Sequence, residues 1–232
     1  MPQINTVLFD LDGTFADTAP DLADALNKTL LANQRAALSF EMIRPVVSHG
    51  GRALIELGFG ISETNPQFDS LRKQLLGYYQ QDIATHTQLF PGIEDLLIAL
   101  TAQDMRWGIV TNKPAWLTDP LLAALPLPSQ PCAVISGDTL RERKPHPAPL
   151  LHACSACATL PQHSIYIGDA ERDIVAGKRA GMLTLGALYG YIGEMDEPFL
   201  WQADGYIEHA GEIHAWISAY NADAAMNQNY AD

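Results

Sequence analysis

Two carboxylates near the N-terminus have a spacing that could support chemistry. Asp10 and Asp12 occur in the stretch FDLDGTFAD, and Gly13 follows them with the backbone freedom that a tight turn needs. Carboxylates gathered at one point can hold a cation. The same short pattern also occurs where an aspartate side chain only stabilises a turn. The pair therefore needs support from other parts of the sequence.

Polar residues also follow three later apolar segments. Thr111 and Asn112 lie in VTNKP and offer a hydroxyl, an amide and backbone N–H groups suited to an anion. Lys144 precedes a proline in RERKPHP, and Asp169 and Asp173 lie in IGDAERD. Taken singly, threonine and asparagine often cap helices, and a lysine is usually solvated. Their recurrence after successive apolar segments is a stronger signal than any one of them.

The apolar segments themselves predict a parallel sheet. Five short stretches rich in Val, Ile, Leu and aromatic residues are typical of buried strands: 6–10, 106–110, 132–135, 164–168 and 183–188. Helical patterns lie between them over 93–103, 147–158 and 171–181. Because strands alternate with helices, the sequence predicts an α/β fold with a doubly wound, Rossmann-like parallel sheet.

Such a sheet would bring the polar residues together, because ligands bind where its strands end. Four successive strands would deliver two carboxylates, a hydroxyl, a lysine and two more carboxylates to one edge. Clustered carboxylates stay ionised only with a cation among them, and oxygen ligands suit Mg²⁺. The metal and Lys144 could then neutralise a phosphoryl group. The sequence therefore predicts a magnesium site that receives a phosphoryl group.

Residues 18–88 predict a separate helical insert after the first strand. Leu22, Leu26 and Leu30 repeat at helical spacing after Pro20, and the segment shows no convincing strand. We predict a core domain over 1–17 and 89–220, a small helical cap domain over 18–88, and a weakly ordered tail over 221–232.

Within the predicted cap, two residues are candidate substrate contacts. Arg52 follows two glycines that would let the backbone approach a ligand, and its guanidinium could meet a carboxylate with two hydrogen bonds. His49 lies close by in the sequence. The alternative for both is a solvated position at the start of a helix.

Composition narrows the range of partners. The chain has 232 residues and a net charge of −13, which disfavours nucleic acid because binding to its phosphates needs lysine and arginine. No apolar run approaches the ~20 residues that cross a bilayer, and the N-terminus lacks a secretion-signal pattern. We expect no membrane partner, a cytoplasmic location, and a monomer or homodimer.

Three cysteines are too few and too unevenly placed to predict a disulfide framework, which agrees with a reducing compartment. Cys154 and Cys157 form a CxxC pair, but both continue a helical apolar stripe that includes Leu150 and Ala153. We therefore predict that this pair serves core packing.

The order and spacing of these motifs resemble the haloacid dehalogenase superfamily over residues 4 to about 190. The resemblance implies that Asp10 is the nucleophile, that Asp12 is the general acid and base, and that hydrolysis passes through an aspartyl phosphate. It also implies that Thr111, with Asn112 beside it, binds the phosphoryl group and that Lys144 holds Asp10 against that group.

The same resemblance implies a ligand set for Mg²⁺. Asp10, Asp169 and the main-chain carbonyl of Asp12 would bind the ion, and Asp173 would support it through water or through a hydrogen bond to one of its ligands. Phe15 stands where the family usually has leucine, a departure that concerns local packing.

Two longer matches narrow the group within the superfamily. DGTFADTAPDL and GDAERDIVAGKRAG resemble the phosphoglycolate phosphatases, whose small cap the helical insert also resembles. VSHGGRALIELGFG, WGIVTNKP and LYGYI resemble the N-acetylmuramic acid 6-phosphate phosphatases of cell-wall recycling. The resemblance implies a Mg²⁺-dependent phosphatase that acts on a small phosphorylated metabolite. Dehalogenation is not expected, because the superfamily's dehalogenases lack the second aspartate and the metal site.

Two alternatives stay open at this point. A phosphomutase of the β-phosphoglucomutase type would use the same nucleophile and could not be distinguished by the first motif. A signalling receiver domain also combines Asp, Thr and Lys with Mg²⁺ on an α/β sheet. Receivers, however, have about 120 residues, place the phosphorylated aspartate after the third strand and carry no helical insert.

Overall fold

The computed structural model describes residues 2–229 and is built on a parallel sheet. Six strands lie in the order β5-β4-β1-β6-β7-β8, and every neighbouring pair is parallel. Their bounds are β1 (Thr6–Phe9), β4 (Arg106–Val110), β5 (Val134–Ile135), β6 (Ser164–Gly168), β7 (Leu183–Ala187) and β8 (Gly205–Ile207). The predicted doubly wound α/β fold is confirmed, with β1 near the middle of the sheet.

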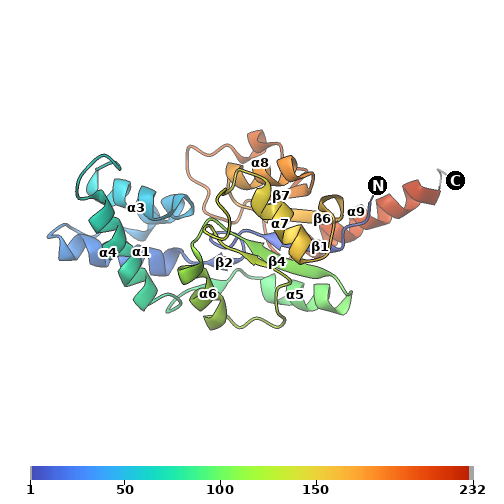
Figure 1. The fold of residues 1–232 in the computed structure, drawn as a ribbon, viewed down its shortest axis with the longest axis horizontal. Helices are drawn as coiled ribbons and strands as arrows, with labels where there is room; N and C mark the ends of the chain where they lie inside the picture. The colour runs from blue at the N-terminus through green and yellow to red at the C-terminus, as the bar shows by residue number, and fades with distance from the viewer. Residues whose placement is uncertain (1, 230–232) are drawn as a thin grey trace.

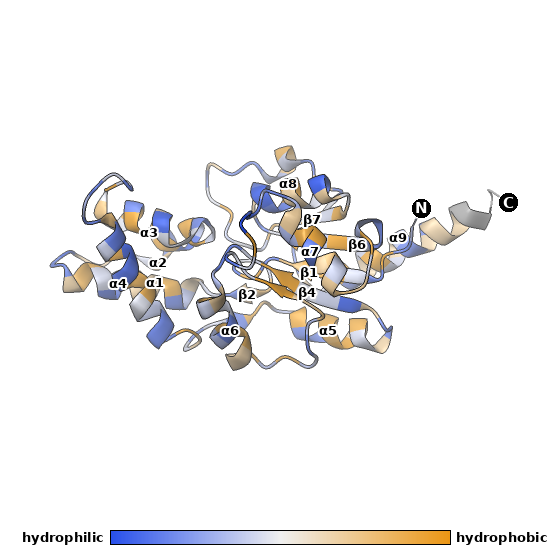
Figure 2. Cartoon of the chain, viewed as in Figure 1, coloured by the Kyte–Doolittle hydropathy of each residue, from blue (hydrophilic) through white to orange (hydrophobic). Residues whose placement is uncertain are grey.

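Helices cover both faces of this sheet (Figure 1). Helices α7 (Ala148–Ala156) and α8 (Glu171–Ala180) lie on one face, and α5 (Ile93–Ala102) lies on the other. Side chains alternate between the faces along β1: Leu8 packs in the core cluster under α7 and α8, whereas Val7 and Phe9 pack in the cluster that includes α5. The strands are accordingly the most apolar part of the chain (Figure 2).

The predicted helical insert lies at one end of the molecule, beside the sheet (Figure 1). A two-stranded antiparallel ribbon, β2 (Ala16–Asp17) with β3 (Gln88–Leu89), joins it to the sheet. Between the two strands come α1 (Ala19–Ala32), α2 (Phe40–Ile43), the 3-10 helix η1 (Arg44–His49), α3 (Gly50–Phe59) and α4 (Phe68–Gln81). Leu26, Leu54 and Leu75, one from each long helix, are fully buried and form the centre of this helical layer. We call residues 18–88 the cap. That the cap is a separate domain stays a prediction.

Besides the β2–β3 ribbon, three further elements were not predicted from the sequence. Helix α6 (Ala115–Ala124) contains Pro120, strand β8 is short and begins with a glycine, and helix α9 (Glu212–Asn229) is rich in alanine and asparagine. Short 3-10 helices also occur, η2 (Pro161–His163) and η3 (Pro198–Trp201). Among residues 2–229, no helix combines the length and the apolar character needed to cross a bilayer.

The predicted tail, residues 221–232, lies mostly in a helix, and its weak order stays a prediction. Helix α9 continues from the core to Asn229, and residues 230–232 lie outside the described residues. Asn221 anchors the helix, because its side chain both accepts from the backbone N–H of Ile4 and donates to the Ile4 carbonyl. Ala224 is fully buried. Most of the small polar residues of the predicted tail therefore belong to a helix that contacts α5 and is bound to Ile4, just before β1.

The prediction for the cysteines is half wrong. Cys154 and Cys157 are buried, as expected for core packing, but Cys157 forms a disulfide with Cys132. Cys132 lies two residues before β5 and Cys157 is the C-cap of α7, and these two elements are neighbours in the fold. The bond spans 25 residues of sequence, so the local CxxC spacing gave no sign of it.

Candidate active site

Asp10 leaves the sheet at the end of β1 and is almost fully buried. One carboxylate oxygen, Oδ1, accepts from the backbone N–H of Leu11 at 2.7 Å and lies 2.8 Å from Lys144 Nζ. The other, Oδ2, lies 3.8 Å from the guanidinium of Arg172. Two cations therefore face this carboxylate from different elements.

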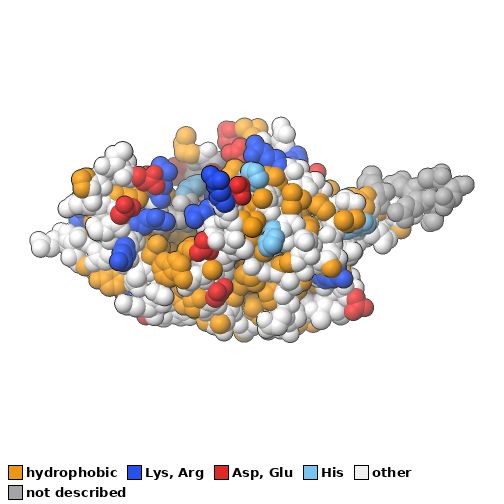
Figure 3. All heavy atoms as spheres, viewed as in Figure 1, with side chains coloured by type: hydrophobic (Ala, Val, Ile, Leu, Met, Phe, Trp, Pro, Cys, Tyr) orange, Lys and Arg blue, Asp and Glu red, His pale blue; other side chains and the backbone are white. Residues whose placement is uncertain are grey.

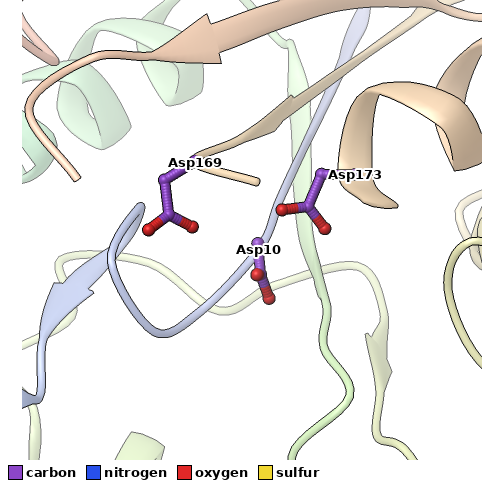
Figure 4. Close-up of side chains that lie close together, drawn as sticks. All are labelled: Asp10, Asp169 and Asp173. Atoms are coloured by element: carbon purple, nitrogen blue, oxygen red, sulfur yellow. The ribbon is translucent and has the colours of Figure 1, made fainter. Parts of the chain in front are cut away.

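Asp169 and Asp173 converge on Asp10, as Figure 4 shows. Asp169 follows β6 and Asp173 lies in the first turn of α8, where an acidic side chain is favoured. One carboxylate oxygen from each of the three residues lies within 4.8 Å of the others, and all three residues are buried. This confirms the predicted meeting of the first and fourth strand ends.

The charges at this point fit a cation. Burial, together with the negative charges of Asp10 and Asp173, raises the pKa of Asp169 to about 7. Burial also raises the pKa of Asp10, and the ammonium of Lys144 opposes that shift. Asp173 Oδ1 is buried without a hydrogen bond among the described residues, although Lys144 Nζ lies 2.8 Å away. Three buried carboxylates with oxygens this close together are a donor set that suits Mg²⁺.

The backbone around Asp169 leaves room for its side chain only because two residues are glycines. A Cβ on Gly13 would collide with Asp169 Oδ2, and a Cβ on Gly190 would collide with Asp169 Cβ. Gly13 also has a φ of +86°, which favours glycine. The backbone N–H of Tyr191 and the hydroxyl of Ser48, which comes from the cap, donate to Asp169 Oδ2 at 2.9 and 2.8 Å.

Lys144 is buried, and Asn112, which follows β4, holds its backbone. The side chain of Asn112 accepts from the Lys144 backbone N–H at 3.1 Å and donates to the Lys144 carbonyl at 3.0 Å. Lys144 Nζ donates to the hydroxyl of Tyr166 at 2.8 Å and lies between Asp10 and Asp173. The side chain of Asn112, for which we predicted a substrate contact, thus fixes the backbone of Lys144.

Asp12 has a different environment from Asp10. Its Oδ1 accepts from the hydroxyl of Thr18 at 2.6 Å and from Lys113 Nζ at 2.7 Å. Its side chain is 17% exposed, whereas that of Asp10 is 4% exposed. Thr111 lies nearby with its hydroxyl accepting from the Lys113 backbone N–H.

A cavity of about 780 Å³ lies between the sheet edge and the cap. The core contributes Asp10, Asp12, Thr111, Asn112, Lys113, Arg143 and Arg172 to its wall, and the cap contributes Ser48, His49, Arg52, Arg72 and Tyr79. Figure 3 shows Lys and Arg side chains gathered around this hollow. The chain is acidic as a whole, so this concentration of cations marks the cavity as suited to an anion.

The two cap candidates differ in their contacts. Arg52 lines the cavity, but its guanidinium is paired with Glu56 at 3.0 Å and with Glu63 at 3.5 Å, and its side chain is 59% exposed. His49 also lines the cavity. Arg72 reaches the same wall without an ion pair among the described residues. The structure therefore brings both predicted residues to the cavity and adds a second arginine.

Sequence reasoning missed several residues of the site. Lys113 directly follows Asn112, and Arg172 directly precedes Asp173. Their positions inside the two motifs could have identified them. Ser48 and Tyr79 lie in the cap and reach the core only through the folded arrangement. No local pattern pointed to either of them.

Comparison with known proteins settles the family. Residues 7–187 match the model of the family described as haloacid dehalogenase-like hydrolase. The chain belongs to the haloacid dehalogenase-like hydrolase family. The matched residues include all the core site residues named above, from Asp10 to Asp173.

Curated members of this haloacid dehalogenase-like family are similar over nearly the whole chain. A phosphoglycolate phosphatase of Xanthomonas campestris pv. campestris (strain 8004) is 40% identical over 89% of this chain and 93% of its own length. An N-acetylmuramic acid 6-phosphate phosphatase of Pseudomonas putida is 36% identical over 94% of this chain and 97% of its own length. This member of the family is therefore a phosphatase, a phosphoric monoester hydrolase.

A solved structure of the family has the same fold. The crystal structure titled as a predicted phosphoglycolate phosphatase from Haemophilus somnus 129PT superimposes with a TM-score of 0.82 at 27% identity. The match covers 93% of this chain and 98% of that chain, so it includes the cap as well as the sheet.

Proposed function

We propose that this chain is a Mg²⁺-dependent phosphatase that hydrolyses a small phosphorylated metabolite through an aspartyl phosphate on Asp10. The observation that carries the proposal is the position of Asp10. Its carboxylate is buried beside Lys144, converges with Asp169 and Asp173, and opens on a cavity lined with cations. A phosphate ester bound in that cavity would place its phosphorus atom next to the carboxylate of Asp10.

In the first step, a carboxylate oxygen of Asp10 attacks the phosphorus, and the bond from phosphorus to the ester oxygen breaks. The leaving oxygen takes up a proton from Asp12, which is then a carboxylate. Lys144 and Arg172 face Asp10 and can offset the negative charge of the phosphoryl group as it approaches.

In the second step, after the alcohol has left, water hydrolyses the aspartyl phosphate. Asp12 takes a proton from that water, the water oxygen attacks the phosphorus, and the bond from phosphorus to Asp10 breaks. Inorganic phosphate leaves, Asp10 is again a carboxylate, and Asp12 is again protonated. Thr111, buried at the cavity wall, is suited to donate its hydroxyl to the phosphoryl oxygens in both steps.

Asp10, Asp169 and the main-chain carbonyl of Asp12 would hold Mg²⁺, supported by Asp173. When bound, the ion would supply Lewis-acid charge stabilisation at the phosphoryl oxygens. The chain's own cations cannot replace it, because three carboxylates and a phosphoryl group leave Lys144 and Arg172 outnumbered.

For the substrate, we propose a phosphate ester that also carries a carboxylate. The similar proteins are named for phosphoglycolate and N-acetylmuramic acid 6-phosphate, and both compounds contain that second group. The cationic cap wall, with Arg52 and Arg72, supports such a substrate because arginine can bind a carboxylate through two parallel hydrogen bonds.

The test of this function is a comparison of substrates with the purified protein. We expect phosphate release from 2-phosphoglycolate or N-acetylmuramic acid 6-phosphate, without a phosphosugar activator. A protein quenched during turnover should carry an acyl phosphate that hydroxylamine removes. A requirement for a bisphosphorylated sugar would instead support the phosphomutase alternative, and the lack of any acyl phosphate would contradict the mechanism.

Asp12→Asn should slow both chemical steps, because an amide neither donates the proton to the leaving oxygen nor accepts one from water. We expect turnover to fall by about 10²- to 10⁴-fold, the usual contribution of general acid and base catalysis. Steady-state phosphate release measures the loss, and unchanged turnover would assign the proton transfers to another group.

Arg52→Lys tests the carboxylate contact. If Arg52 leaves Glu56 and Glu63 to bind the substrate, kcat/KM for 2-phosphoglycolate should fall by roughly tenfold or more, because a charged hydrogen bond contributes about 1.5 to 3 kcal/mol. p-Nitrophenyl phosphate has no carboxylate and should be hydrolysed almost as by the wild type. Arg72→Lys, measured in parallel, tells which of the two arginines makes the contact, and equal losses on both substrates would indicate a folding defect.

A further inference from the structure

Lys113 is the cation closest to Asp12, and its position is fixed from several sides. Its backbone N–H donates to the Thr111 hydroxyl at 3.1 Å, and its carbonyl accepts from the Gly137 N–H at 2.8 Å. Its Nζ lies 2.7 Å from Asp12 Oδ1, and the side chain is 6% exposed. A lysine this deeply buried is uncommon and needs partners that stabilise its charge.

Two groups supply that stabilisation, and they come from different parts of the chain. Asp12 belongs to the turn after β1, whereas Tyr79 belongs to α4 of the cap, and its ring centroid lies 4.5 Å from Lys113 Nζ. Burial alone lowers the pKa of Lys113, but Asp12 and Tyr79 outweigh it and raise this pKa above its usual value. Lys113 is therefore a charged link between the core and the cap.

The face of the Tyr79 ring contacts the ammonium of Lys113; the hydroxyl also helps to raise the pKa of Lys113, but it makes no hydrogen bond of normal geometry among the described residues. Tyr79 is 1% exposed, and its hydroxyl is buried without a hydrogen-bond partner among the described residues. A leucine at this position would remove the face that the ammonium contacts, whereas a phenylalanine would keep it.

The two oxygens of Asp12 have unequal surroundings. Thr18 and Lys113 both donate to Oδ1, and Oδ2 accepts no hydrogen bond from any described residue. Asp12 lines the cavity and retains 17% exposure. Anchoring one oxygen fixes the rotation of the carboxylate and leaves the other oxygen available to a ligand in the cavity that Asp12 lines.

We propose that Lys113 is a positioning residue for Asp12 and that Tyr79 holds Lys113 from the cap, so that Asp12 Oδ2 is aimed at the leaving oxygen only when the cap is in place. The inference rests on the proposed function, because it explains how Asp12, the proposed general acid and base, is held in position. It identifies a contact through which the cap reaches the chemistry of the core.

The test uses the dependence on the leaving group. An alkyl oxygen needs a proton to leave, whereas p-nitrophenolate leaves without one, so a misplaced Asp12 should affect the two substrates unequally in the first step. We expect Lys113→Met to slow acyl phosphate formation from 2-phosphoglycolate by about 100-fold, the cost of misplacing a reacting group by about 1 Å. Formation from p-nitrophenyl phosphate should slow by less than about fivefold, and because hydrolysis of the acyl phosphate also needs Asp12, a burst of p-nitrophenolate should appear.

Three further variants separate the parts of the contact. Lys113→Arg keeps the charge beside Asp12 and should recover much of the rate with 2-phosphoglycolate. Tyr79→Leu should reproduce the unequal loss in weaker form, and Tyr79→Phe should lose less than Tyr79→Leu. Lys73→Met, at an exposed position on the same helix α4, is the control that should match the wild type.

Each outcome counts for or against the proposal. Equal losses on the two substrates in folded Lys113→Met would overturn it, because they would indicate that Lys113 binds the phosphoryl group common to both. Wild-type rates for Lys113→Met would overturn it as well. A wild-type enzyme that forms no acyl phosphate would contradict the proposed function itself, which is a separate result from either of these.

Discussion

Asp10→Asn is expected to abolish turnover, with a fall of about 10⁴-fold or more, the scale seen when an enzyme loses its nucleophile. The amide cannot attack phosphorus, and it also removes one of the three carboxylates that converge at the strand ends. The same variant should form no acyl phosphate in a quench experiment. Phosphate release and hydroxylamine-sensitive labelling measure the two effects independently.

An exposed aspartate provides the matched control. Asp95→Asn, on the outer side of α5, makes the same chemical change away from the cavity and should retain wild-type turnover. Residual activity above about one percent in a folded Asp10→Asn protein would contradict a covalent mechanism on this residue.

Removal of divalent metal is the second large effect that we expect. With chelator present, phosphate release should fall to background, because buried Asp169 and its neighbours would then repel an incoming phosphoryl group. Addition of Mg²⁺ in excess should restore the full rate. Ca²⁺ should not restore it and should inhibit, since its larger and more flexible coordination shell disturbs the geometry of attack.

The metal can also be measured without activity. Titration of Mg²⁺ into the wild-type protein, followed by calorimetry, should give a binding signal that Asp169→Asn weakens strongly. Full turnover in chelator would exclude the metal from the mechanism, and binding that survives Asp169→Asn unchanged would place the ion elsewhere.

The core of the site was predictable because each residue follows a recognisable apolar strand. The sequence predicted that Asp10 and Asp169 share one edge of the sheet, and the structure adds that they are close because β1 and β6 are adjacent. Lys144 follows the edge strand β5 and reaches the same point, which confirms the general rule for open parallel sheets.

Contacts between segments that are distant in the sequence, and that no local sequence pattern links, could not be predicted in this way. Tyr79 lies on an apolar stripe of α4 and has the sequence pattern of an ordinary core residue, yet its ring contacts Lys113 of the core. Cys132 and Cys157 meet because β5 packs against α7, and their spacing carries no signal. The partners of Arg52 include Glu63, which lies beyond the end of α3. In each case the tertiary arrangement of the chain, and not local propensity, decides the contact.

The close packing of Gly13 and Gly190 against Asp169 determines which substitutions the enzyme can tolerate at these two positions. Neither glycine has a side chain that could take part in the reaction, and yet an added methyl at either position would push directly on Asp169. Substitutions there should therefore inactivate the enzyme as thoroughly as many changes to the charged residues. In a collection of random variants screened for activity, these two chemically silent positions should stand out as intolerant, and a screen for expression alone would miss many of them.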